Sequence, residues 1–269
     1  MKSIVVIMSV YKGDSLPLLR ESLGSLYEQT IKADIHIWID GQINENIKNF
    51  LYSEFKKGNI KFIGENKKNL GLAYSLNSLL KLAVDKYKYI ARMDADDISM
   101  PYRIEKQFNF MEAHPDIDVV GGYIEEFSDD GEYIKKVTYP LTHDEMYCFF
   151  KKRVPLAHVT AFYRRTFFEK AGFYPTKSLR NEDTLMWMKG FEDGCRFANI
   201  PEVLVRVRVS PSFFDRRGGI KKAWRDFRDR IEVIRTLGYN FDAYLYALAL
   251  FLVNISPGSV KRYLYKRLR

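Results

Sequence analysis

Short apolar runs alternate with amphipathic segments along the first half of the chain. Four runs have the length and composition of buried strands: Ser3–Val10, Asp34–Ile39, Ile60–Ile63 and Tyr89–Met93. Between them, apolar residues recur at helical spacing in three segments, at 16–28, 43–55 and 69–86. Strands that alternate with helices in this way are typical of a parallel sheet with helices on its faces. We therefore expect an α/β fold with a mostly parallel central sheet flanked by helices.

The regular alternation ends after the amphipathic segment Arg103–Ala113. Two apolar runs, Val119–Phe127 and Tyr133–Thr138, enclose Asp129-Asp130-Gly131, which predicts a β-hairpin. The other elements expected are a helix near Asp144–Lys152, a strand near His158–Tyr163, helices at Thr166–Ala171 and from Asn181, and an edge strand at Glu202–Val209. The second half of the chain is thus predicted to mix helices with less regular strands.

Length and cysteine content narrow the class of protein. The 269 residues suit one large α/β domain, or one domain with a C-terminal extension. Two cysteines, Cys148 and Cys195, do not make a disulfide framework, so a reducing compartment is expected. The N-terminal apolar run is short and is followed by Tyr11-Lys12-Gly13-Asp14, which favours a buried strand over a signal peptide. These features predict a cytoplasmic protein.

The positive charge lies mainly in the C-terminal tail. The formal net charge is +9, and residues 215–269 contain 13 Lys and Arg against 5 Asp and Glu. The rest of the chain is nearly neutral, with 30 basic and 29 acidic residues. A nucleic-acid-binding protein would more commonly carry a basic patch on its main domain, so we expect no nucleic-acid partner.

Three carboxylates, Asp94, Asp96 and Asp97, directly follow a predicted strand. The carboxyl ends of strands form the edge at which open α/β folds bind ligands. Carboxylates this close together repel one another unless a cation neutralises them, and their hard oxygens suit Mg²⁺ or Mn²⁺ completed by substrate phosphates. The alternative is a solvated acidic turn that caps the next helix. The cluster therefore predicts either a metal site or a helix cap.

Four segments that stand in a fixed order identify a family: Val6–Tyr11, Leu23–Thr30, Asn69–Ala73 and Met93–Asp97. Together they resemble the inverting glycosyltransferases of family 2, which have the GT-A fold. The resemblance implies a GT-A catalytic domain over residues 1–215, followed by a basic, aromatic-rich helical extension over residues 216–269. The sequence Arg216-Arg217-Gly218-Gly219 is similar to the subgroup that builds bacterial O-antigen, capsule and exopolysaccharide repeat units on a lipid carrier.

The resemblance assigns residues to the nucleotide-sugar donor. Ser9, Val10 and Tyr11 would surround the nucleotide base, and Asp40 would accept a hydrogen bond from it. The family usually carries an acidic pair at the end of the second strand, whereas this chain has Asp40-Gly41-Gln42.

The turn and the metal would complete the donor site. Asn69 and Gly71 would shape the turn beside the donor, although helix capping and a tight turn explain them equally well. Asp96 would hold Mn²⁺ or Mg²⁺ against the diphosphate, and Asp94 would contact the ribose or support the metal. Asp97 would either support the metal ligands without binding the metal itself, or cap the following helix.

An inverting transfer also needs a general base that takes the proton of the acceptor hydroxyl. Asn181-Glu182-Asp183 precedes a predicted helix and resembles the Glu-Asp motif of the family, with Asp183 as the base and Glu182 as the alternative. The alternative explanation is an acidic first turn that interacts with the helix dipole. His158 resembles a residue on the acceptor side, although a lone histidine is as often structural.

Several arginines could bind a diphosphate. Arg206 and Arg208 alternate on a predicted strand, and Arg216 and Arg217 lie in a glycine-containing loop. A guanidinium group binds phosphate through two parallel hydrogen bonds, so these side chains could hold either the donor diphosphate or the acceptor's lipid diphosphate. The alternative is a solvated basic loop.

The tail combines apolar, aromatic and basic residues. Lys221–Leu237 is predicted to be a basic amphipathic helix, Ala243–Val253 is an apolar run, and Lys261–Arg269 is basic. The apolar run is shorter than the roughly 20 residues that span a bilayer. Such a segment either lies in the membrane interface, with basic residues toward anionic lipid, or packs back on the catalytic domain.

These features together predict an enzyme that transfers a hexose, glucose or galactose, from a UDP-sugar to a sugar on polyprenyl diphosphate, with inversion to a β-linkage. It would act at the cytoplasmic face of the inner membrane as a peripheral protein. An alternative is a nucleotidyltransferase that forms sugar nucleotides. That class generally has a glycine-rich basic loop after the first strand, whereas Ser9–Ser15 contains one glycine and one lysine.

Overall fold

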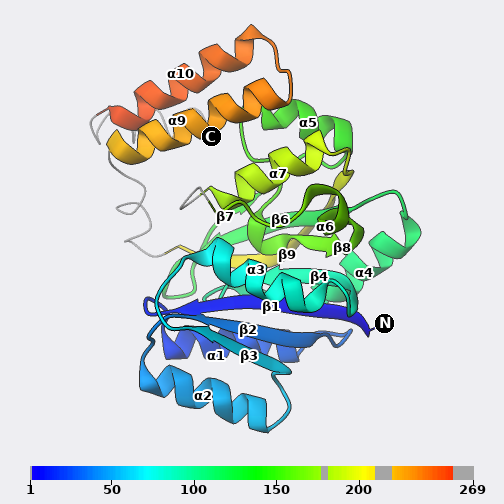
Figure 1. Ribbon diagram of the computed structural model, residues 1–269, viewed down its shortest axis with the longest axis vertical. Helices are drawn as coiled ribbons and strands as arrows, with labels where there is room; N and C mark the ends of the chain where they lie inside the picture. Colours follow the sequence, from blue (N-terminus) through cyan, green and yellow to red (C-terminus); the bar gives the residue numbers. More distant parts are fainter. Residues whose placement is uncertain (1, 177–180, 210–219, 257–269) are drawn as a thin grey trace.

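The alternation of apolar and amphipathic segments corresponds to alternating strands and helices in the structure, a computed structural model that describes residues 2–176, 181–209 and 220–256 (Figure 1). The strands are β1 (Lys2–Tyr11), β2 (Asp34–Asp40), β3 (Phe62–Asn66), β4 (Tyr87–Met93), β5 (Ile98–Ser99), β6 (Val119–Phe127), β7 (Tyr133–Val137), β8 (Phe162–Arg164) and β9 (Phe197–Arg208). The α-helices are α1 (Leu16–Tyr27), α2 (Glu45–Lys56), α3 (Leu72–Ala83), α4 (Arg103–Ala113), α5 (His143–Phe150), α6 (Thr166–Ala171), α7 (Glu182–Glu192), α9 (Ile220–Thr236) and α10 (Phe241–Ile255).

One mostly parallel sheet runs through the described residues, in the order β3-β2-β1-β4-β8-β6-β9-β5. The first four strands are parallel, β8 is antiparallel to both of its neighbours, and β6 pairs with β9 in parallel. Strand β7 forms the predicted hairpin with β6. The α/β fold with a mostly parallel sheet is therefore confirmed.

Side chains of β1 enter two cores, one on each face of the sheet. Val6 and Met8 belong to a core with residues of α1, α2 and α4. Val5 and Ile7 face the opposite way and belong to a core with residues of α3, α5, α6 and α7. Successive side chains of a strand alternate between faces, so a strand that is apolar at every position must be covered on both sides. This explains the continuous apolar run at the start of the chain.

Several predicted elements have other bounds or another conformation in the structure. The third strand begins at Phe62, two residues later than expected. The first half of the strand predicted at His158–Tyr163 is a single 3₁₀ turn, because Thr160 and Ala161 donate backbone hydrogen bonds to the carbonyls three residues before them. Strand β8 starts only at Phe162. Residues of this segment are buried in the turn as well as in the strand, so the apolar pattern could not distinguish the two conformations.

The strand predicted as an edge is the second part of a longer strand. β9 begins at Phe197, and its pairing with β6 shifts register after Ile200, beside Pro201. A register shift accommodates a proline, which cannot donate to the ladder. The short strand β5 pairs with the other side of β9, so β9 is not the edge of the sheet.

Helices α9 and α10 form the C-terminal part of the described chain and lie beside α5 and α7 in Figure 1. Ala243 and Ala247 of α10 are buried against Ile234 of α9. Within residues 2–176, 181–209 and 220–256, no helix has the length and apolar character needed to cross a bilayer.

Candidate active site

The acidic turn follows β4 directly, and its three carboxylates have three different environments. The carboxylate of Asp94 accepts a hydrogen bond from one nitrogen of the Arg92 guanidinium group and forms an ion pair with the other. Asp97 is buried, with 3% of its surface exposed, and accepts the backbone N–H of Arg208 at 2.9 Å. Asp96 is exposed to solvent at the carboxyl edge of the sheet. Asp96 is therefore the carboxylate of this turn that is most accessible to an incoming cation.

Negative charge is in excess around this turn. Burial raises the pKa of Asp97 well above its usual value, and the charges of Asp94 and Asp96 raise it further. Partial desolvation and the charge of Asp94 also raise the pKa of Asp96. Carboxylates whose pKa values are raised by one another favour the binding of a cation.

The residues of the turn fit a metal ion that is bound partly by the protein and partly by the substrate. Among the described residues, no three Asp, Glu, His or Cys side chains are arranged as a complete metal site. Mg²⁺ and Mn²⁺ sites of phosphate-transferring enzymes commonly use one or two carboxylates, with water and substrate phosphates completing the shell. Asp96 can provide such a carboxylate, while Asp94 is already paired with Arg92.

The predicted nucleotide-binding segment lies at the end of β1, next to β2. Val10 is fully buried in the core and exposes no surface to a ligand in this structure. Tyr11 is 38% exposed and lies opposite Asp40 in the register of the two strands. Ser9 is partly buried, and it precedes the loop in which the backbone N–H of Tyr11 donates to Asp14 at 2.8 Å.

Asp14 is a site residue that the sequence analysis did not find. Burial raises its pKa to about 7, against the hydrogen bond from Tyr11, and the charges of Asp96 and Asp94 act in the same direction as burial. The side chain of Asp14 therefore lies near the acidic turn. An acidic residue three positions after the end of β1 was the available signal.

Asp40 organises the loop before α3. Its carboxylate accepts backbone N–H groups from Leu70 and Gly71, both at 2.8 Å, and the side-chain amide of Asn66 at 2.9 Å. The side chain of Asn69 donates to the backbone carbonyl of Asp40 at 3.2 Å. Gly71 has a φ of 97°, which strongly favours glycine, and it is the N-cap residue of α3. Asp40, Asn69 and Gly71 thus lie together, as one turn at the carboxyl edge of the sheet.

Arg208 fixes the acidic turn from β9. Its guanidinium group donates to the carboxylate of Glu21 at 2.6 Å and to the backbone carbonyl of Asp96 at 3.2 Å. The side chain also lies over the ring of Phe127, and the residue is 8% exposed. Arg206 pairs instead with Glu125 at 2.7 Å. Arg216 and Arg217 lie outside the described residues, so their expected contacts with a diphosphate stay predictions.

The predicted base lies in the first turn of α7, whose N-cap residue is Asn181. The backbone N–H of Thr184 donates to the carboxylate of Asp183 at 2.7 Å. Burial raises the pKa of Asp183, whereas this hydrogen bond and the charge of Arg92 lower it. Burial and the charge of Asp183 raise the pKa of Glu182. A carboxylate with a raised pKa is a stronger base than an exposed one, as proton abstraction requires.

Arg92 connects the two acidic groups. It is 4% exposed, it binds Asp94 directly, and its charge also acts on Glu182 and Asp183. The charge of Asp94 likewise acts on Glu182. The charge of one buried guanidinium group therefore acts on both the acidic turn and the first turn of α7, although about 90 residues separate them in sequence.

His158 is also affected by the charge of Arg92, and its environment favours the neutral form of the imidazole. Its Nε2 atom is 2.8 Å from the hydroxyl of Tyr174, which is itself 2.6 Å from the hydroxyl of Tyr163. Burial lowers the pKa of His158 well below its usual value, and the charge of Arg92 lowers it further. Asn77 of α3 fixes Tyr174 through two hydrogen bonds with its backbone.

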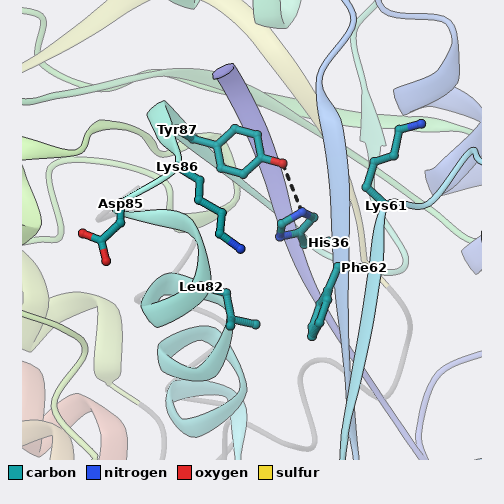
Figure 2. A pocket seen from close by; sticks show the side chains of 7 residues that line it. All are labelled: His36, Lys61, Phe62, Leu82, Asp85, Lys86 and Tyr87. Atoms are coloured by element: carbon teal, nitrogen blue, oxygen red, sulfur yellow. Dashed lines mark hydrogen bonds between the residues drawn. The ribbon is translucent and has the colours of Figure 1, made fainter. Parts of the chain in front are cut away.

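A cavity elsewhere on the sheet is separate from this site. A cavity of about 510 Å³ lies next to the hydrogen bond between Tyr87 and His36, and Figure 2 shows the side chains that line it. Tyr87 begins β4 and His36 lies near the start of β2, so the cavity is at the amino ends of these strands. The acidic turn lies at their carboxyl ends. The cavity is therefore not the place where the predicted donor and base residues meet.

A parallel α/β sheet with carboxylates clustered at its carboxyl edge is typical of a nucleotide-binding enzyme, and comparison with known proteins identifies its family. Residues 5–172 match the model of the glycosyl transferase family 2, and the chain belongs to this family. It is 31% identical to the amylovoran biosynthesis glycosyltransferase AmsE of Erwinia amylovora, over 97% of both chains. It is also 31% identical to the UDP-Gal:alpha-D-GlcNAc-diphosphoundecaprenol beta-1,3-galactosyltransferase of Escherichia coli, over 97% of this chain and 94% of the other. The predicted resemblance to bacterial surface-polysaccharide glycosyltransferases is confirmed.

Solved structures confirm the GT-A fold. The chain aligns with S. aureus TarS 1–349 in complex with UDP, with a TM-score of 0.64 and 19% identity, over 93% of this chain and 70% of that one. It aligns with the mannosyltransferase PcManGT of Pyrobaculum calidifontis, solved with GDP-Man and Mn²⁺, with a TM-score of 0.65 and 17% identity, over 98% and 79% of the two chains. The protein is thus a glycosyltransferase, and its membership of this family argues against the alternative of a nucleotidyltransferase.

Proposed function

We propose that this glycosyltransferase moves a hexose, glucose or galactose, from a UDP-sugar to a sugar on polyprenyl diphosphate and forms a β-linkage by inversion. The observation that carries the proposal is that Arg92 pairs with Asp94 of the acidic turn while its charge also acts on Asp183. A donor-side carboxylate and a partly buried base would thus belong to one site. The Escherichia coli relative is named for a UDP-galactose donor and a diphosphoundecaprenol-linked acceptor, which supports the same chemistry here. The product would enter a bacterial surface polysaccharide.

The donor would bind along the carboxyl edge of β1, β2 and β4. Ser9, Val10 and Tyr11 would line the base, and the turn held by Asp40 would close one side of the nucleotide. Asn69 and Gly71 belong to this turn and would shape it. Asp94, held by Arg92, would accept a hydrogen bond from the ribose or support the metal.

Asp96 would hold Mn²⁺ or Mg²⁺, with Asp94 as a further ligand. The metal, when bound, would stabilise negative charge on the departing nucleoside diphosphate. Arg208 keeps the backbone of Asp96 in place, and Arg216 and Arg217 would add positive charge near a diphosphate.

Asp183 would take the proton from the acceptor hydroxyl as that oxygen attacks the anomeric carbon. Glu182 is next to it and would orient the acceptor, or serve as the base if the hydroxyl lies on its side. The position of Asp183 in a first helical turn and the charge of Arg92 favour its anionic form, against the effect of burial. His158 is neutral and hydrogen-bonded to Tyr174, so it would shape the acceptor side without carrying charge.

The extension over residues 216–269 would attach the enzyme to the membrane at the cytoplasmic face of the inner membrane. Five large apolar side chains of α10 are exposed at intervals of four, three, four and three residues, and thus share one face: Phe241, Leu245, Leu248, Leu252 and Ile255. The opposite face packs on α9, which carries exposed basic residues. An apolar stripe beside basic residues fits the interface of an anionic bilayer. The basic residues of 257–269 lie outside the described residues.

The test is release of UDP from a panel of UDP-sugars, with and without Mn²⁺, in the presence of a synthetic lipid-diphosphate sugar. Asp96→Ala is expected to abolish the metal-dependent rate, and Asp183→Asn to lower kcat by about 10²- to 10⁴-fold, the usual contribution of a general base. Asp144→Asn is the matched control, because Asp144 is an exposed acid in the first turn of α5. Wild-type turnover by Asp183→Asn would refute the assignment of the base.

A further inference from the structure

Helix α9 binds Asn181, the N-cap residue of helix α7, which carries the proposed base. The side-chain amide of Asn181 donates to the carboxylate of Asp229 at 2.7 Å and to that of Asp226 at 3.1 Å. Asp229 is buried, with 2% of its surface exposed. Asn181 is the N-cap residue of α7, and Glu182 and Asp183 are the next two residues. The carboxylates of α9 are thus linked to the start of the helix that carries the proposed base.

These hydrogen bonds are not the usual interactions of an N-cap residue. An N-cap asparagine normally accepts a hydrogen bond from a backbone N–H of its own helix. The side chain of Asn181 makes no such bond, and its amide nitrogen donates instead to two acids of another helix. The first turn of α7 is therefore oriented by a contact between helices. The ion pairs Lys222–Asp226 and Arg228–Asp229 partly neutralise the two acids.

Helix α9 can act as an anchor because it is itself attached to the catalytic domain. Arg230 donates to the backbone carbonyl of Phe150 at 2.6 Å, at the end of α5. Tyr147 of α5 donates its hydroxyl to the carbonyl of Leu237, and Tyr239 donates its hydroxyl to the carbonyl of Tyr147 at 2.5 Å. Each bond joins α5 to α9 or to the residues directly after it. The acceptors of the Asn181 amide are therefore held in a fixed position relative to the core.

We propose that Asp229, acting through Asn181, is a positioning residue that sets the orientation of Asp183 toward the acceptor hydroxyl. The inference rests on the proposed function of Asp183 as the base. Hydrogen bonds to a charged acceptor are stronger than neutral ones, and a misplacement of about 1 Å in a catalytic group can cost about 100-fold in rate. Catalysis would thus depend on a helix that lies outside the residues 5–172 matched to the family.

The test compares Asn181→Ala, Asp229→Ala and Asp229→Asn with Asp183→Asn in the same assay. Asn181→Ala and Asp229→Ala are expected to lower kcat by about 10- to 100-fold with an unchanged KM for the UDP-sugar, because the donor residues lie on other elements. Asp229→Asn keeps an acceptor oxygen and is expected to stay within about threefold of wild type. The kcat of the double variant Asn181→Ala/Asp229→Ala should be no lower than that of the less active single variant, because both substitutions remove the same hydrogen bond.

Glu232→Ala is the control, because Glu232 is an exposed acid on the same helix. Should Asp229→Ala fail to fold, Asn181→Ala decides the matter, since Asn181 is only partly buried. Wild-type kcat in Asn181→Ala beside an inactive Asp183→Asn would overturn the positioning role and leave the proposed base intact. A fully active Asp183→Asn would overturn both. Equal loss in Asp229→Asn and Asp229→Ala would show that the hydrogen bond to Asn181 is not what the residue provides.

Discussion

Substitution of Asp40 tests whether a carboxylate at the edge of the sheet stabilises the fold or binds the ligand. It is 2% exposed and accepts three hydrogen bonds, from Leu70, Gly71 and Asn66, at 2.8 to 2.9 Å. A hydrogen bond to a charged group contributes about 1.5–3 kcal/mol. The three donors are not fully buried, so water replaces part of what is lost. We therefore expect Asp40→Ala to lower the free energy of unfolding by about 3 kcal/mol, the equivalent of one to two such bonds.

The conservative variant gives a second value. One oxygen of Asp40 accepts from both Leu70 and Asn66, and the other accepts from Gly71. In Asp40→Asn the amide oxygen can keep the first two bonds, but the amide nitrogen would face the N–H of Gly71. The expected loss is then about 1.5 kcal/mol, close to one bond.

Equilibrium unfolding in urea and thermal unfolding by circular dichroism measure both variants. For a chain of this size, about 3 kcal/mol corresponds to a fall in Tm of roughly 6–12 °C. Asn44→Ala is the control, because it removes a single exposed N-cap bond of 2.8 Å, worth about 1 kcal/mol. An unchanged free energy of unfolding in Asp40→Ala, together with weakened UDP binding, would refute the structural role and favour direct contact with the base.

Two further predictions concern the base and the membrane. Burial raises the pKa of Asp183, and only its deprotonated form can accept a proton. We therefore expect kcat/KM to be full above this pKa and to fall as the pH drops through it, at a midpoint above that of an ordinary carboxyl group; a midpoint at or below the ordinary value would contradict this. Leu248→Asp should reduce co-flotation with vesicles of anionic phospholipid at least several-fold, whereas Ile134→Asp, also at a residue that is 46% exposed but on β7, should float like wild type.

The fold was largely predictable because three of its first four strands, β1, β2 and β4, are mostly buried on both faces. A strand such as β1, which supplies Val6 to one core and Ile7 to the other, must be apolar at nearly every position, and this produces a clear pattern. The pattern failed at His158–Tyr163, where burial on several sides does not require a strand. It also missed the first half of β9, because Pro201 interrupts the apolar run.

The locations of the site residues could be predicted from the sequence, but their hydrogen-bond and ion-pair partners could not. The carboxyl edge of a parallel sheet locates Asp40, Asp94 and Asp96 together, whatever their partners are. The partners depend on the folded chain, as the hydrogen bond from Arg208 to the backbone of Asp96 illustrates. Arg92 was overlooked because it lies inside an apolar strand. A charged residue two positions before Asp94, in a strand that is otherwise buried, was the signal, since side chains at this spacing point to the same face.

The arrangement of the helices also bears on how a lipid-linked acceptor would reach the base. Asp183 lies at the start of α7, the helix on which α9 packs, and the exposed apolar face belongs to α10, which packs on α9 (Figure 1). The turn of Asp40 lies beside strands β2 and β3, which form one end of the sheet, away from α9 and α10 in Figure 1. A membrane contacted through α10 would therefore be nearer to the base than to the nucleotide end of the site. An acceptor anchored in that membrane would present its hydroxyl from the side of Asp183, while the UDP-sugar would be free to enter from solution.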